Sequence, residues 1–332
     1  MNIIFSYELL YPPYDEGVKK LAYMICQTLK KKHQVTVLRN IPYLPNVINS
    51  ILIMPRIIIS SLFKKSDKII YIPKGALTFS AIIKVWLASF FLGEKFVVVS
   101  VQRKILSRFQ KKIVMHITLR NIFTLSSALA DELLDLGIHA KVLTTGIDLD
   151  RFTPNNANKK ALRKKYNLPE NKKILLHVGH IRETRNILWL QDVQNTLPDI
   201  QVVIIGSTAT EQDDHIRVAL ESSGVIILRQ SLPEVQEVYQ ASDIYCFPVT
   251  ELQGAMEIPL SVLEAMAVNL PIITTKFGRL PELFDEDKHY KYFNNSAEII
   301  SILKTNFDEN CLNRKKLSPF TWEHTASTLI AN

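Results

Sequence analysis

The sequence predicts an α/β protein made of two domains, and three observations support this. The chain has 332 residues, which is the length of two domains of ordinary size. Residues 2–6 indicate a strand, and a helical pattern over 18–32 leads into a second strand, QVTVL. The β-branched run FVVVS at 96–100 suits a strand buried in a parallel sheet. This order of elements is typical of a doubly wound domain.

The first domain is expected to continue with further pairs of strand and helix. KIIYI at 68–72 precedes a loop and a helix at about 78–92, and IFTLS precedes a helix over SALADELLDLGI. The loop ahead of the first helix contains two prolines and Gly17. It lacks the G-x-G-x-x-G pattern, so a dinucleotide site is not expected there.

A second α/β domain is expected after an interdomain linker that begins at Pro154 and is rich in asparagine. Strands are indicated at KILLHV and QVVIIGS, each followed by a loop and a helical segment. We expect the first domain to span 1–154 and the second 155–316. A final helix within 317–332 is expected to cross back to the first domain.

Composition favours a cytoplasmic protein. The three cysteines have no metal-like spacing and form no disulfide framework, which fits a reducing compartment. The first ten residues lack a basic region and a long apolar run, so no signal peptide is expected. The apolar segments 47–63 and 76–92 are interrupted by Pro55, Arg56 and Lys84, so no transmembrane helix is expected.

Positive charge is concentrated in the first domain. Residues 1–154 contain 21 Lys and Arg residues and 10 Asp and Glu residues, whereas the remainder carries a net negative charge. This indicates an anionic partner: a membrane surface, a lipid-phosphate acceptor or a nucleic acid. Residues 103–115 fit either a basic amphipathic helix on a membrane or a solvated helix. No nucleic-acid-binding module is recognisable, so nucleic acid is not an expected partner.

The stretch 254–275 contains the clearest functional pattern. Pro259 favours a helix start, so we expect a turn at 254–258, a helix at 259–268 and a strand at 270–275. Glu257 and Glu264 are seven positions apart and are expected to share one face. Amides at a helix start attract phosphate, and carboxylates accept hydrogen bonds from hydroxyls. Together these groups would suit a nucleotide sugar.

This stretch resembles the donor-binding signature of family 4 retaining glycosyltransferases, E-x7-E followed by A-M-A. The resemblance implies a GT-B fold, in which two Rossmann-like domains face each other across a cleft. Glu264 matches the second glutamate, which implies that it holds the donor ribose. Glu257 stands one residue late for the first glutamate, which contacts the sugar, and Met256 occupies that place. Leu260 and Ser261 are implied as further donor contacts.

Residues 179–186 resemble the phosphate-gripping G-R-x-x-x-x-K-G loop of the same family. Gly179 matches, His180 stands in place of the arginine, Arg185 in place of the lysine and Asn186 in place of the second glycine. Arg182 adds a cation. The resemblance implies that His180 and Arg185 stabilise the negative charge that develops on the departing nucleotide.

Further positions follow from the resemblance. Gly17 is implied in the glycine-bearing loop of the donor site, and Gln102 stands where the family often has a histidine, with Arg103 beside it on the acceptor side. Arg229 to Leu232 are implied to frame the nucleotide base. Gly146, Asp148, Arg151 and Phe152 match a linker-side signature. Asp148-x-Asp150 is not expected to bind metal, because the GT-B fold works without one.

The function implied is hexosyl transfer, with retained configuration, from a UDP- or GDP-sugar to a glycan or lipid-linked acceptor in cell-envelope polysaccharide assembly. No cofactor or metal is expected; Asp213, Asp214 and His215 are adjacent on a helix and point apart. Peripheral contact with an anionic membrane at its inner face is part of this hypothesis. Two alternatives stay open: a nucleotide-sugar epimerase, and a catalytically degenerate binding protein favoured by Met256, Gln102 and His180.

Overall fold

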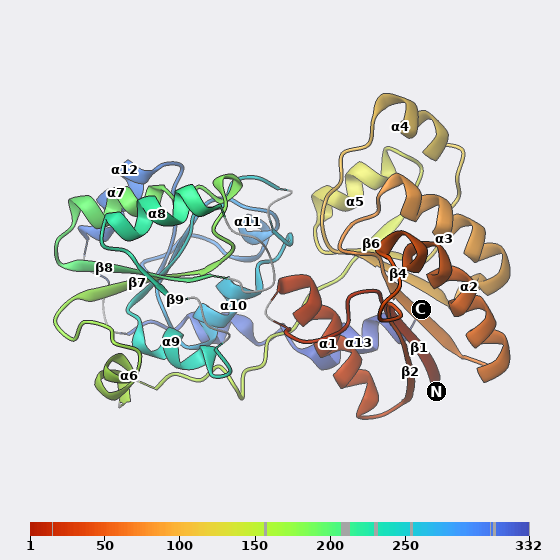
Figure 1. Ribbon diagram of the computed structural model, residues 1–332, viewed down its shortest axis with the longest axis horizontal. Helices are drawn as coiled ribbons and strands as arrows, with labels where there is room; N and C mark the ends of the chain where they lie inside the picture. Colours follow the sequence, from red (N-terminus) through yellow and green to blue (C-terminus); the bar gives the residue numbers. More distant parts are fainter. Residues whose placement is uncertain are drawn as a thin grey trace. The chain divides into compact units, whose positions relative to one another are not determined.

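The computed structural model describes residues 1–14, 16–155, 158–206, 213–228, 232–252, 255–305, 307 and 310–331 (Figure 1). The chain forms two compact units. Unit 1 contains 1–146, 256–258 and 320–332, and unit 2 contains 147–255 and 259–319. The first change of unit therefore precedes the expected linker, and the chain returns to unit 1 for three residues around Glu257.

Unit 1 is a doubly wound α/β domain. Its strands are β1 (Asn2–Tyr7), β2 (Gln34–Leu38), β3 (Lys68–Ile72), β4 (Phe96–Ser100), β5 (Ile122–Thr124) and β6 (Ala140–Val142). They pair in parallel in the order β2-β1-β3-β4-β5-β6. Its helices are α1 (Gly17–Lys30), α2 (Asn46–Lys64), α3 (Phe79–Leu92), α4 (Arg108–Val114), α5 (Ser127–Leu134) and α13 (Trp322–Ile330).

The helices of unit 1 divide between two packing groups. Buried residues of α2, α3, α4 and α5 join side chains of β1, β3, β4 and β5 in one core cluster. α1 and α13 lie side by side (Figure 1), and Lys31 Nζ is 3.2 Å from Glu323 Oε1. Thr325 Oγ1 donates to Thr144 O at 2.8 Å, and a side chain at Gly146 would clash with Trp322. Gly146, matched above to a signature, thus permits close packing of the last helix.

Two helices of unit 1 differ from expectation. The basic helix expected over 103–115 begins only at Arg108, because Ser107 and Gln110 form a capping box there. α2 continues through Pro55 over 19 residues. By length and composition alone it is long and apolar enough to cross a membrane, although Pro55 and Arg56 were expected to interrupt such a segment.

Unit 2 is a second parallel domain. Its strands are β7 (Lys173–Gly179), β8 (Ile200–Gly206), β9 (Ile226–Leu228), β10 (Ile244–Phe247), β11 (Ile272–Thr274) and β12 (Tyr290–Tyr292). They pair in the order β12-β11-β10-β7-β8-β9, which is the strand order of Rossmann domains. Its helices are α6 (Lys159–Lys165), α7 (Trp189–Thr196), α8 (Asp214–Ser222), α9 (Val235–Ala241), α10 (Leu260–Ala267), α11 (Leu280–Leu283) and α12 (Ser296–Leu303).

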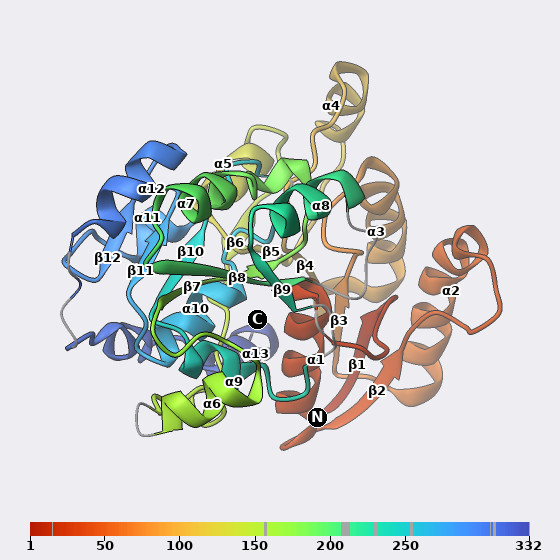
Figure 2. The same cartoon turned by 60° about the vertical axis from the view of Figure 1, so that its left-hand side comes forward.

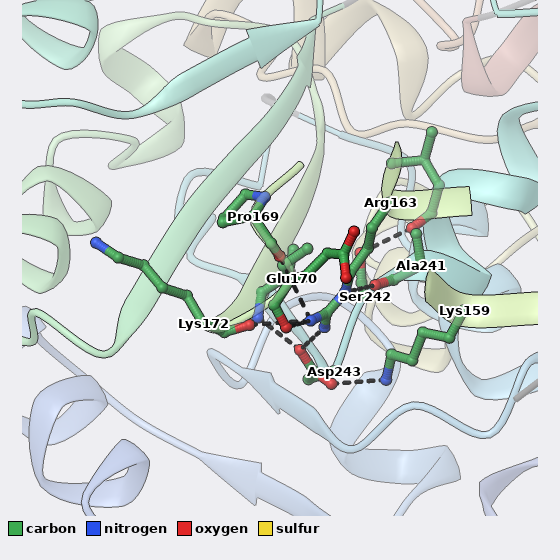
Figure 3. Close-up of polar contacts among 10 residues, drawn as sticks. Lys159, Arg163, Pro169, Glu170, Lys172, Ala241, Ser242 and Asp243 are labelled. Carbon is green, nitrogen blue, oxygen red and sulfur yellow. Dashed lines mark hydrogen bonds and ion pairs between the residues drawn. The ribbon is translucent and has the colours of Figure 1, made fainter. Parts of the chain in front are cut away.

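A buried arginine ties α6 to the sheet of unit 2 (Figure 3). Arg163 Nε donates to Ala241 O at 3.0 Å, and Nη1 donates to the carbonyls of Glu170 and Lys172, both at 3.1 Å. Its Nη2 donates to Asp243 Oδ2 at 2.5 Å. Lys159 Nζ lies 2.6 Å from the other oxygen of Asp243. One guanidinium therefore satisfies carbonyls at the beginning of β7 and at the end of α9.

Replacing Arg163 by Met is expected to lower the free energy of unfolding by about 3 kcal/mol, because several carbonyls and Asp243 would lose their donor. Urea unfolding of the full chain measures this. Lys160→Met, at an exposed position of the same helix, is the control and should change stability by less than about 0.5 kcal/mol. Equal unfolding midpoints for the two variants would contradict the structural role.

Candidate functional site

The candidate site of unit 2 lies where its strand order reverses. β7 pairs with β8 on one side and β10 on the other, so the connections leave in opposite directions. In open α/β sheets, ligands bind beyond the carboxyl ends of the strands at such a point. Beyond these ends lie the loop 179–186 after β7 and residues 248–252 after β10, and α10 begins at Leu260. The loop 179–186 and the first turn of α10 contain six residues expected at a donor site, namely Gly179, His180, Arg182, Arg185, Leu260 and Ser261.

Gly179 allows two side chains to approach the end of β7. A Cβ atom there would lie 2.9 Å from His177 Nε2 and 3.4 Å from an Nη atom of Arg185. Arg185 is buried, so it is not the exposed cation of a helix start. The sequence pattern singled out Gly179 and Arg185, and the structure brings them together.

His177 was not predicted from the sequence, yet it lies next to both of these residues. Its side chain is fully buried, and Nδ1 lies 2.9 Å from Cys246 O. This places the proton on Nδ1 and leaves a lone pair on Nε2. Burial, with the charges of Arg185 and His180 nearby, lowers the pKa of His177 to about 4. A histidine within a strand that leads into a glycine loop was the only available signal.

Asn186 explains how the loop tolerates the loss of the expected second glycine. Its φ of 51° and ψ of 29° lie in the left-handed region, which glycine and asparagine adopt most readily. Its Nδ2 donates to Pro248 O at 3.0 Å and to Thr250 Oγ1 at 2.7 Å. Asparagine at this position therefore keeps the left-handed backbone conformation. It also joins the loops after β7 and β10, at the switch point where the strand order of unit 2 reverses.

The other cations of the loop lie differently. Arg182 is exposed and His180 is half-buried. Glu183 N donates to Asp213 Oδ2 at 2.9 Å, and Asp213 N donates to Ile181 O at 3.0 Å. Asp213 thus supports the loop.

Among the described residues, no group of three or more His, Cys, Asp and Glu side chains could hold a metal ion.

Glu264 lies on α10 in the interior of unit 2. Its side chain is 4% exposed, and Tyr239 Oη donates to its Oε2 at 2.9 Å. Tyr239 in turn packs edge-to-face on Phe152, with ring centroids 5.8 Å apart. Leu260 and Ser261 form the first turn of α10, where helix amides lack partners within the helix. The linker-side residue Phe152 thus supports the tyrosine that orients Glu264.

Glu257 lies in the segment before α10, as the expected turn at 254–258 requires, and not on the helix that carries Glu264. The helix begins at Leu260 after Pro259, so Glu257 precedes it and belongs to unit 1. Its side chain has no exposed area, and Arg103 Nε donates to its Oε1 at 2.8 Å. Burial raises the pKa of Glu257, and Arg103 opposes that shift. A contact of Glu257 with the donor sugar stays a prediction.

Three other predicted residues gather in unit 1. Gly17 is the first residue of α1, and a Cβ there would lie 3.3 Å from Met256 Sδ. Gln102 N donates to Gly75 O at 2.7 Å, so Gln102 lies against the loop after β3. Arg103 also bonds Glu132 Oε1 at 2.6 Å.

The residues expected to frame the nucleotide base belong to unit 2. Leu232 is half-buried there, and Arg229 to Ser231 lie outside the described residues.

Sequence reasoning missed Glu8, at the switch point of the unit 1 sheet. β1 lies between β2 and β3, and Glu8 follows β1 directly. This carboxylate is 2% exposed, accepts a bond from Tyr71 Oη at 3.2 Å and lies 3.4 Å from Lys74 Nζ. A carboxylate directly after a buried strand was the available signal. It supplies a polar group of the kind an acceptor or an epimerase site needs.

Comparison with known proteins bears on these two units. Residues 158–306 match the family model described as glycosyl transferases group 1. A Bacillus subtilis (strain 168) protein named for teichuronic acid biosynthesis is 27% identical over 175 residues, which are 52% of this chain and 42% of that protein. The D-inositol 3-phosphate glycosyltransferase of Mycolicibacterium smegmatis is 27% identical over 211 residues, 58% of this chain and 46% of that protein. The chain thus spans less than half the length of these relatives.

Solved structures show the fold. Sucrose-phosphate synthase from Thermosynechococcus elongatus superimposes with a TM-score of 0.77 at 14% identity, covering 99% of this chain and 97% of that one. Anabaena HepE in complex with UDP and glucose gives a TM-score of 0.73 at 14% identity, covering 100% and 98%. The expected GT-B class, with two Rossmann-like domains, is confirmed.

The buried neutral His177 predicts a pH dependence of stability. Its folded-state pKa lies below the unfolded value of about 6.5, so the unfolded chain binds the proton more tightly. Stability should therefore fall as pH drops from about 6.5 to 4, by roughly 3 kcal/mol for this group. Urea unfolding at a series of pH values measures the slope. His177→Leu should flatten it, whereas His324→Leu, at an exposed position, should not. Identical slopes in all three proteins would refute this account.

Arg103→Met is expected to destabilise the protein by about 3 kcal/mol, because it leaves the Glu257 carboxylate buried without a cation. The double variant Arg103→Met/Glu257→Gln should regain at least about 1 kcal/mol, since the buried charge is then removed. Urea unfolding of the single and double variants gives the coupling. Strictly additive losses would show that the ion pair contributes no coupling energy.

Proposed function

We propose a function for this chain on the basis of its family. The chain belongs, through residues 158–306, to the glycosyl transferases group 1 family. It transfers a hexosyl group, with retained configuration, from a nucleotide sugar to a glycan or lipid-linked acceptor in cell-envelope polysaccharide biosynthesis. The observation that carries this proposal is the switch point of unit 2, where Gly179, Arg185 and the start of α10 meet the carboxyl ends of β7 and β10.

The geometry of unit 2 supports binding of a nucleoside diphosphate. Arg185 is held beside Gly179, and its guanidinium can bond two phosphate oxygens at once. The first-turn amides of α10 suit an anion, and Glu264 offers a carboxylate for ribose hydroxyls. UDP and UDP-glucose are bound by HepE, which has the same fold. We infer a UDP- or GDP-sugar as donor and no metal or cofactor.

Bond cleavage in this proposal depends on the leaving group. Negative charge grows on the departing diphosphate, and Arg185, with His180 and Arg182 in the same loop, stabilises that charge more in the transition state than in the ground state. The acceptor hydroxyl attacks from the side of the departing phosphate, which takes the proton. Such a step needs positioning more than a protein base.

The acceptor side of the proposal rests on unit 1. Gln102 and Arg103 lie on the segment that follows β4, and Glu8 lies at the end of β1. These groups can bond hydroxyls of a glycan. We place the protein in the cytoplasm, at the inner face of the membrane, where a lipid-linked acceptor would be met.

Calorimetric titration with UDP, GDP and ADP tests the donor site. One nucleotide should bind the native chain, and Glu264→Ala should weaken that binding by about 1–3 kcal/mol through loss of charged hydrogen bonds. Glu170→Ala, an exposed carboxylate of unit 2, is the control and should bind as the native chain does. Equal weakening in both variants would contradict a specific role of Glu264.

If none of the three nucleotides binds, the degenerate binding protein becomes the favoured alternative. A specific observation supports that alternative: Met256 stands in place of a glutamate, and Glu257 is engaged with Arg103. Once a donor is identified, the anomeric configuration of the product, followed by NMR, distinguishes retention from inversion.

A further inference from the structure

α2 has the composition of a buried helix, but only one of its sides is covered. Ile53, Met54 and Ile57 pack into the core of unit 1. The other side presents Ile51, Ile59, Leu62 and Phe63, with Phe63 85% exposed. Only 28% of the most apolar window of α2 is buried. A helix that is apolar all round normally lies in a protein core or in lipid, so the outer side of α2 lacks the apolar environment that it suits.

The same surface continues over the neighbouring helices of unit 1. α3 packs against both α2 and α4 and lies between them in the two views (Figures 1 and 2). Phe90 and Phe91 of α3 are exposed, as are Ile105, Phe109 and Met115 in and around α4. We call the outer sides of α2, α3 and α4 the apolar–basic face. Exposed apolar side chains gathered on neighbouring helices in this way indicate an interaction site.

The charge of this part of the chain is almost entirely positive. Residues 17–130 contain 19 Lys and Arg residues but only two acids, Asp67 and Glu94. Both acids are occupied: Asp67 Oδ2 accepts from Asn2 N at 2.7 Å, and Glu94 pairs with Arg120 at 2.8 Å. Among the described residues, no ion pair engages the exposed cations Lys64, Lys65, Lys104, Arg108, Lys111 and Lys112. The face therefore offers free positive charge beside apolar side chains.

We propose that the apolar–basic face docks unit 1 onto a bilayer that contains anionic phospholipid. Exposed aromatic and aliphatic side chains would enter the headgroup region, while the cations meet lipid phosphates. A second copy of the chain fits less well, because a symmetric interface would bring the same cations together. α2 lies along the surface rather than across the bilayer, because its inner side is committed to the core.

This inference deepens the proposed function by naming the surface at which a lipid-linked acceptor would be met. Only the presence of that acceptor depends on the proposed function; the docking of unit 1 on lipid does not. Vesicle binding needs no nucleotide. Failure of docking and failure of donor binding are therefore separate results.

Vesicle sedimentation of the full chain tests the proposal. The native protein should bind vesicles of phosphatidylcholine with phosphatidylglycerol far better than phosphatidylcholine alone, and high salt should weaken the binding. Changing Lys104, Arg108, Lys111 and Lys112 together to Gln should lower the partition coefficient roughly tenfold or more. Phe63→Ser/Phe90→Ser/Phe91→Ser should also lower it, because apolar insertion is lost.

Matched variants of unit 2 are the controls. Lys160, Lys164, Lys276 and Lys304, all exposed, are changed together to Gln, and Val218, Leu188 and Leu312 to Ser. These variants should bind vesicles as the native chain does, and circular dichroism checks that every variant is folded. Equal losses in the controls, or native binding by the face variants, would overturn the proposal. So would a native dimer that the Phe→Ser changes dissociate, since the face would then join two copies.

Discussion

The structure of unit 2 depends on the position of β7 at the centre of its sheet. Because β7 pairs with β8 on one side and β10 on the other, the loops after β7 and β10 diverge and leave their backbone groups beyond the sheet edge. Asn186 Nδ2 bridges the two loops. The buried Arg163 bonds groups that precede β7 and β10, namely Lys172 O, Ala241 O and Asp243 Oδ2. The two strands on which the candidate site depends are therefore fixed at both ends.

Two residues depart from the family pattern in different ways. One of them keeps the backbone conformation of the residue that it replaces, and the other has changed contacts. Asn186 adopts the left-handed backbone that a glycine would adopt, so the loop retains its path. Glu257, one position later than the pattern requires, is buried in unit 1 and accepts a hydrogen bond from the half-buried Arg103. The first change preserves a backbone shape, whereas the second redirects a charge. A comparison of sequence patterns treats both as single mismatches, but their physical consequences differ.

Unit 1 combines a packed α/β core with an exposed apolar and basic outer surface. Its core is an ordinary doubly wound sheet covered by helices, with α1 and α13 forming a second packing group. Its outer helices carry exposed phenylalanines beside exposed lysines and arginines that form no ion pair within the described part of the chain, so the positive charge counted in the sequence has a location on the molecule. Glu8 adds a buried carboxylate at the end of β1, near Tyr71 and Lys74. The two features give unit 1 both a sheet-edge polar site and an interaction surface.

Local sequence patterns determined the elements and the motif positions. FVVVS forms β4 and Pro259 immediately precedes α10, because β-branching and proline geometry act over a few residues. Only the tertiary structure decided which side chains meet. Arg103 and Glu257 are 154 residues apart in the sequence, and His177 and Arg185 both approach the position that a Cβ atom of residue 179 would occupy. Such contacts depend on how strands pair and where the chain returns to unit 1, which no local pattern encodes.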